Sequence, residues 1–97
     1  MSDVEVRKRN NVTTVGSGHG RPLLFAHGFG CDQGMWRLLA PVFAEDHPIV
    51  LVDHVGSGAS ESSAYDALKY STMDGYAEDL LAVCEALDLH DVVLVGH

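Results

Sequence analysis

Two patterns of apolar residues alternate along this chain of 97 residues. Runs that are apolar at every position, at 23–26, 49–52 and 92–95, are typical of strands covered on both faces, as in a parallel sheet. Between the runs, apolar residues recur at helical spacing over 35–43 and 76–87. Strands and helices in this order predict an α/β fold with right-handed crossovers and a mostly parallel sheet.

The flanks of these elements carry weaker signals. Pro41 lies inside the first helical stretch and is expected to kink or split it. Ser71 and Asp74 have the spacing of a capping box, which predicts the start of the second helix. Short β-type stretches on both sides of a turn at 9–11 predict an opening hairpin, and their valines are Val4, Val6, Val12 and Val15. The glycine cluster at 16–20 precedes a strand, so it favours a tight turn over a dinucleotide-binding loop.

Composition narrows the classes of partner. The formal net charge of −8 argues against nucleic acid and against an anionic membrane surface, because both are bound by clustered Lys and Arg. The first ten residues contain no apolar run, and no segment approaches the roughly 18–20 apolar residues of a membrane span. We therefore expect a cytoplasmic protein. Cys31 and Cys84 lack CxxC spacing and the histidines lack H-x-x-x-H spacing, so we expect no metal and no cofactor, and a buried thiol at Cys84.

The loops that leave the carboxyl ends of the predicted strands are where a parallel sheet binds ligands. The first is His-Gly-Phe-Gly at 27–30, where glycine allows the backbone to approach a substrate closely. Phe29 is in position to offer its N–H to an oxyanion, and its ring could line an apolar pocket. The alternative is a core phenylalanine in an ordinary strand–helix turn.

The second loop, at 53–60, suggests a structural role, whereas the third, at 96–97, suggests the start of a catalytic motif. Asp53 and the glycines and serines at 56–60 look catalytic, but no base accompanies them, and we favour a carboxylate that holds loop N–H groups. Gly96 and His97 match the first two residues of a nucleophile elbow, G-x-S-x-G, in which a serine sits between a strand and a helix.

Four segments together carry a family resemblance: His27-Gly28-Phe29-Gly30-x-Asp32-Gln33-x-x-Trp36, Asp53-x-x-Gly56-x-Gly58, Tyr76-x-x-Asp79 and Val95-Gly96-His97. The set resembles the α/β-hydrolase superfamily, and within it the RsbQ-like bacterial stress-response regulators and the related plant karrikin and strigolactone receptors. The resemblance implies that residues 1–97 are the N-terminal portion of one α/β-hydrolase domain, ending just before the nucleophile serine. It also implies an acid and a histidine later in the protein, Phe29 as an oxyanion donor, and a substrate site at Gly28, Phe29 and His97.

Three functional hypotheses follow from the resemblance. The first is a serine hydrolase that acts on a small apolar ester or lactone. The second is a ligand-sensing regulator in stress signalling that keeps the hydrolase site and activates a partner phosphatase with a PAS sensor domain, with little turnover. The third is that these 97 residues alone are inactive and fold poorly, because the strand at 92–95 would be an apolar edge.

Overall fold

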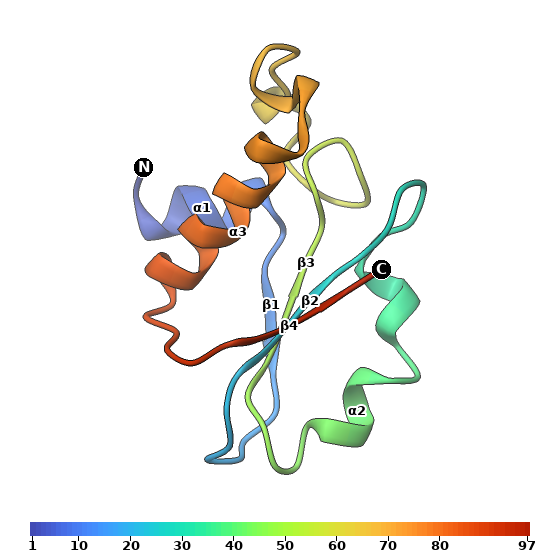
Figure 1. Ribbon diagram of the computed structural model, residues 1–97, viewed down its shortest axis with the longest axis vertical. Coiled ribbons are helices and arrows are strands. Elements are labelled where there is room, and N and C mark those ends of the chain that lie inside the picture. The colour runs from blue at the N-terminus through green and yellow to red at the C-terminus, as the bar shows by residue number, and fades with distance from the viewer.

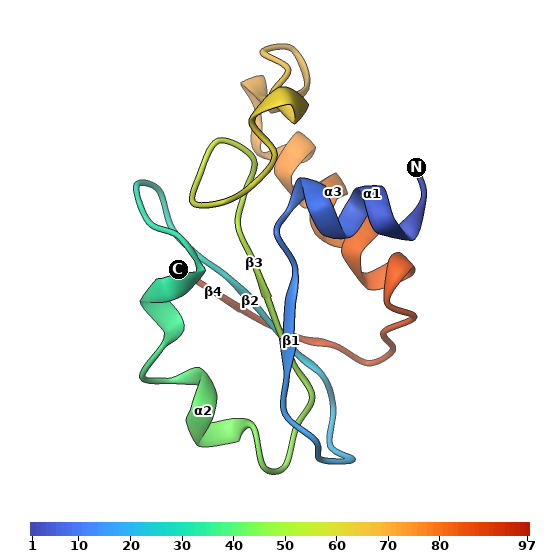
Figure 2. The ribbon, with the colours of Figure 1, turned by 180° about the vertical axis from the view of Figure 1, so that it is seen from behind.

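The computed structural model describes residues 1–97 as a four-stranded sheet with helices on both faces (Figures 1 and 2). The strand order is β1-β3-β2-β4, in which β2 runs parallel to both neighbours and β1 runs antiparallel to β3. The strands are β1 Thr13–Val15, β2 Leu23–Ala26, β3 Ile49–Val52 and β4 Val93–Gly96. This confirms the predicted α/β class and its parallel core, with the last strand displaced by one residue from the expected 92–95.

The helices divide between the two faces of the sheet. Figures 1 and 2 show α1 and α3 together on one face and α2 on the other. The α-helices are α1 Asp3–Arg9, α2 Ala40–Phe43 and α3 Met73–Ala86, and the 3₁₀ turns are Gln33–Trp36, Ser62–Ala64 and Lys69–Ser71. No helix is both long enough and apolar enough to cross a membrane.

Strand β2 is buried at all of its positions because it supplies both halves of the core. Leu24 packs with Val6 of α1 and Val83 of α3. Phe25 faces the opposite way and packs against Trp36, with ring centroids 5.0 Å apart. The uninterrupted apolar run is therefore explained as predicted, by a strand that is covered on both faces.

The predicted opening hairpin is wrong. Its first arm is the helix α1, which begins at a capping box formed by Ser2 and Glu5, and only Thr13–Val15 forms a strand, paired with β3. Acidic residues in the first turn of α1 and basic residues in the last turn suit the helix dipole. Val4 remains exposed and Val6 is buried, so their alternation reflects one side of a helix and not the pleat of a strand.

The two predictions about helix boundaries had different outcomes. Pro41 splits its stretch as expected: a 3₁₀ turn ends at Trp36, and Pro41 lies in the first turn of α2, where its missing N–H costs nothing. The capping box at 71–74 is wrong. Thr72 is the N-cap of α3 and makes no side-chain cap bond, while the Ser71 hydroxyl donates to the Leu68 carbonyl at 2.8 Å.

A buried charge network joins α1 to α3. The Asp79 carboxylate is 1% exposed and lies 3.3 Å from Nη1 of Arg9, whose side chain is 5% exposed. The Lys69 ammonium and the Tyr70 hydroxyl each donate to Asp79 at 2.7 Å. Arg9 also donates to Oδ1 of Asn10, which in turn donates from its amide to the Asp53 carbonyl at 3.0 Å. The network thus connects the helices to the carboxyl end of β3.

Candidate functional site

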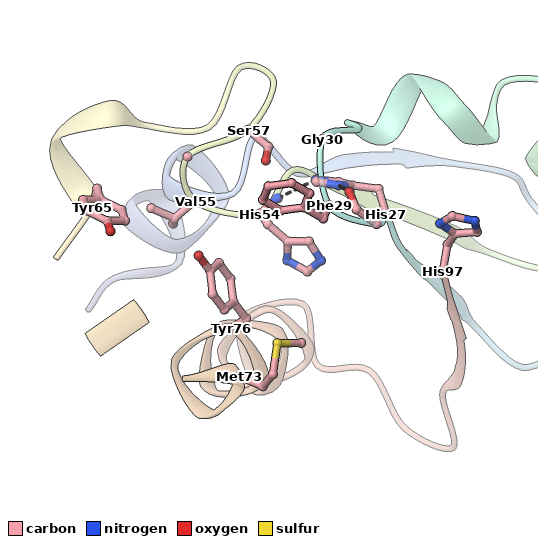
Figure 3. A pocket seen from close by; sticks show the side chains of 12 residues that line it. His27, Phe29, Gly30, His54, Val55, Ser57, Tyr65, Met73, Tyr76 and His97 are labelled. Carbon is pink, nitrogen blue, oxygen red and sulfur yellow. Dashed lines mark hydrogen bonds between the residues drawn. The ribbon is translucent and has the colours of Figure 1, made fainter. Parts of the chain in front are cut away.

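The chain reverses its direction of winding at β2, because β3 lies on one side of β2 and β4 on the other. Ligands of open parallel sheets bind at the carboxyl ends of the strands at such a reversal. A cavity of about 460 Å³ opens there (Figure 3). Its lining comes from all three predicted loops, from α3 and from the residue after the 3₁₀ turn at 62–64: His27, Gly28, Phe29, Gly30, His54, Val55, Gly56, Ser57, Tyr65, Met73, Tyr76 and His97.

Phe29 lies at the mouth of this cavity with a fully exposed side chain. Within residues 1–97 the ring therefore packs into neither half of the core. The Phe29 N–H donates to no acceptor within the chain, while the next turn closes through the Cys31 N–H, which donates to the Gly28 carbonyl at 3.1 Å. Gly30 follows with φ of +77°, a left-handed value that glycine adopts without strain. The loop therefore presents a free backbone donor beside the cavity.

Gly28 allows the end of β4 to approach this loop. A Cβ atom at Gly28 would lie 2.5 Å from Nδ1 of His97 and 3.1 Å from its carbonyl oxygen. The His97 N–H in turn donates to the Ala26 carbonyl at 3.2 Å, which continues the pairing of β2 with β4. The structure thus brings the three predicted substrate-site residues, Gly28, Phe29 and His97, to one wall of the cavity.

His27 ties the first loop to the second. Its Nε2 accepts from the His54 N–H at 2.9 Å, and its Nδ1 lies 2.9 Å from the Gly28 carbonyl. Because a backbone N–H can only donate, the buried ring carries its proton on Nδ1 and donates it to Gly28. His27 therefore acts as a structural clip between the loops.

Asp53 has the structural role that we favoured. Its carboxylate accepts from the side chain of Asn11 at 2.9 Å and from the backbone N–H groups of Gln33 and Ala59 at 2.8 and 3.0 Å. Burial opposes ionisation, but these hydrogen bonds outweigh it and hold the pKa of Asp53 below its usual value. Gly58 has φ of +53°, and a Cβ atom there would lie 2.6 Å from the same carboxylate.

The sequence reasoning missed the far wall of the cavity. His54 and Tyr76 face the Phe29 loop there, with their rings edge to face and 5.7 Å apart (Figure 3). Burial of the ring and the neighbouring His27 hold the pKa of His54 below its usual 6.5. His54 directly follows Asp53 at a strand end, and Tyr76 starts the apolar spacing of α3. These two positions are the sequence signals from which the far wall of the cavity could have been predicted.

Neither cysteine lines this cavity, although the Cys31 thiol lies 3.8 Å from the Phe29 carbonyl. No three His, Cys, Asp or Glu side chains gather where they could hold a metal ion. Cys84 is partly buried on α3, and burial raises the pKa of its thiol. Cys31 is also a free thiol, and it lies in the loop beyond Phe29.

Comparison with known proteins agrees with this geometry. The family model for the alpha/beta hydrolase fold matches residues 21–97. The chain is 37% identical to the karrikin insensitive 2 receptor CA of Petunia hybrida, covering 95% of this chain and 34% of the relative. It is 38% identical to the strigolactone esterase D14 of Arabidopsis thaliana, covering 100% of this chain and 36% of the relative. A hydrolase from Oleispira antarctica superposes with a TM-score of 0.94 at 40% identity, covering 100% of this chain and 35% of the solved one. The chain therefore spans about a third of the length of these relatives.

Proposed function

The chain belongs to the α/β-hydrolase fold family, and from that premise we propose that the complete protein hydrolyses a small apolar ester or lactone through a serine that directly follows His97. The observation that carries the proposal is the unpaired Phe29 N–H, in a loop that follows β2 and lines the cavity together with His97. An oxyanion hole needs such a donor in addition to the N–H of the residue after the nucleophile.

The proposed reaction follows the acyl-enzyme route. The serine Oγ attacks the carbonyl carbon and its proton passes to a histidine, which an acid orients. Both of these partners lie outside residues 1–97. The carbonyl oxygen becomes an oxyanion that accepts from Phe29, a contribution of about 3 kcal/mol for one donor. Collapse expels the alcohol with the proton from histidine, and water then releases the acid by the same steps.

The cavity supports a small substrate with an apolar body. Its volume of about 460 Å³ is in the usual range for small-molecule pockets. The side chains of Phe29, Val55 and Met73 offer apolar surface, and no Asp, Glu, Lys or Arg side chain belongs to the lining. A strigolactone esterase among the relatives fits an ester or lactone as the substrate class.

Turnover of p-nitrophenyl esters by the complete protein tests the proposal. We expect a burst and steady turnover that are lost when the residue after His97 is changed from serine to alanine. Finding anything other than Ser, Cys or Asp at that position would remove the nucleophile and the proposal with it. Turnover that survives the alanine change would place the chemistry elsewhere.

A second candidate is a ligand-sensing regulator, which the receptor name of one relative favours. In this alternative the same cavity binds the ligand in the cytoplasm, and the protein then activates a partner phosphatase with a PAS domain in stress signalling. Hydrolysis is slow or serves only to reset the sensor. Affinity capture with a PAS-domain phosphatase encoded nearby, with and without an ester ligand, is the test. Absence of complex in both conditions would exclude this partner.

A further inference from the structure

His54 is the one imidazole that projects into the middle of the cavity, between Phe29 on one side and Tyr76 on the other (Figure 3). Its backbone is fixed, because its N–H donates to Nε2 of His27 at 2.9 Å. Its ring is fixed as well, since the His27 ring lies 4.5 Å away and the Tyr76 ring 5.7 Å away. A side chain held in this way meets a ligand in a single orientation.

Neither ring nitrogen of His54 has a hydrogen-bond partner in the chain. Nδ1 is covered by protein atoms and has none, whereas Nε2 is not among the covered atoms. Buried donors without a partner are rarer than buried acceptors without one. This favours the neutral ring with its proton on Nε2, which is the nitrogen open to the cavity.

We propose that His54 is a specificity-determining residue whose Nε2–H donates to a second oxygen of the substrate, outside the group that is cleaved. The inference rests on the proposed ester or lactone hydrolysis and adds a substrate class to it: esters or lactones that carry a further ether, carbonyl or hydroxyl oxygen. The apolar side chains of Phe29, Val55 and Met73 cannot pair such an oxygen. Hydroxyls of Ser57, Tyr65 and Tyr76 also line the cavity, so the His54 variants below isolate the contribution of the imidazole. A substrate that has the oxygen satisfies the imidazole, and one without it leaves the donor unpaired.

The low pKa of His54 agrees with this role. Burial and the adjacent His27 lower the pKa of the ring and so favour its neutral form, which recognises an uncharged oxygen and does not attract a carboxylate.

The test compares kcat/KM of the complete protein for p-nitrophenyl hexanoate and for analogues in which one chain methylene is replaced by an ether oxygen. The ratio of ether to parent ester within each variant cancels differences in folded fraction and in intrinsic reactivity. We expect at least one ether position for which His54→Phe lowers this ratio about fivefold, the size of one neutral hydrogen bond. His54→Gln keeps a side-chain donor and should retain part of the preference. His90→Phe, at an exposed histidine in the turn that follows α3 and outside the cavity lining, is the matched control and should leave the ratio unchanged.

The outcomes separate the two proposals. Turnover with ratios that agree within about twofold between wild type and His54→Phe at every ether position would overturn the role of His54 alone. Equal loss in His54→Phe and His54→Gln would also overturn it, because the ring shape and not the donor would then decide. Absence of turnover on every ester would remove the proposed hydrolysis, and this inference with it.

Discussion

Replacing Asp79 by asparagine keeps the shape of the side chain and removes the negative charge at the centre of the buried network. The Asp79 side chain is 1% exposed and that of Arg9 is 5% exposed, so the guanidinium would remain buried without its counter-charge. Breaking one partner of such a pair costs about 3–5 kcal/mol. Lys69 is a third exposed and can turn to water, and Arg9 keeps its bonds to the Asn10 side chain and the Asp79 carbonyl. We therefore expect a loss near the lower end, about 3 kcal/mol.

Urea unfolding of the complete protein, followed by circular dichroism, measures this loss. The matched control is Asp88→Asn, because Asp88 pairs with His90 while both side chains are largely exposed, and its loss should stay below about 0.5 kcal/mol. Replacing Arg9 and Asp79 together by Met and Leu should recover most of the loss, since no unpaired charge is then buried. A loss below about 1 kcal/mol for Asp79→Asn, or a double variant no better than the single one, would refute the reasoning.

Three further predictions concern the loops. Gly28→Ala should lower kcat/KM for p-nitrophenyl esters by roughly 10- to 100-fold, because its Cβ would push His97 away from the Phe29 loop; an unchanged value would contradict their close contact. The folded-state pKa of His54 lies below 6.5, so its contribution to stability is complete above that pH and is lost as the pH falls below it. Unfolding midpoints measured from neutral to mildly acidic pH should therefore fall less in His54→Gln than in wild type, and parallel curves would exclude the effect. Gly58→Ala should cost about 2 kcal/mol or more in urea unfolding, since a left-handed φ is combined with a clash against Asp53; a loss under about 0.5 kcal/mol would show that the loop relaxes freely.

The parts of the fold that the sequence predicted are those that burial determines. The runs at 23–26 and 49–52 are apolar throughout because both faces of the sheet are covered, and no surface strand needs that pattern. The prediction of a hairpin arm at the start of the chain was wrong because the spacing of Val4 and Val6 is compatible with a strand and with a short helix. The deciding signal was the pair Ser2 and Glu5, whose spacing is that of a capping box.

The candidate site was predictable only along its backbone. Loops after parallel strands converge at one edge of the sheet, so 27–30, 53–58 and 96–97 could be placed together from topology alone. The orientation of the His54 side chain could not be predicted, because it depends on the hydrogen bond to His27 and on the contact with the Tyr76 ring of α3. Asp79 appeared as part of a family motif, and only the structure shows that its charge is buried against Arg9.

The position of β2 between β3 and β4 also determines how long this strand lacks a partner during synthesis. Leu23–Ala26 leaves the ribosome before its second neighbour, Val93–Gly96, which follows about seventy residues later. At roughly 5–20 residues per second, the apolar strand waits several seconds with one edge unpaired. An unpaired apolar edge is a template for association with other chains. Slower translation between these two strands is therefore expected to lower the yield of soluble protein, and faster translation to raise it.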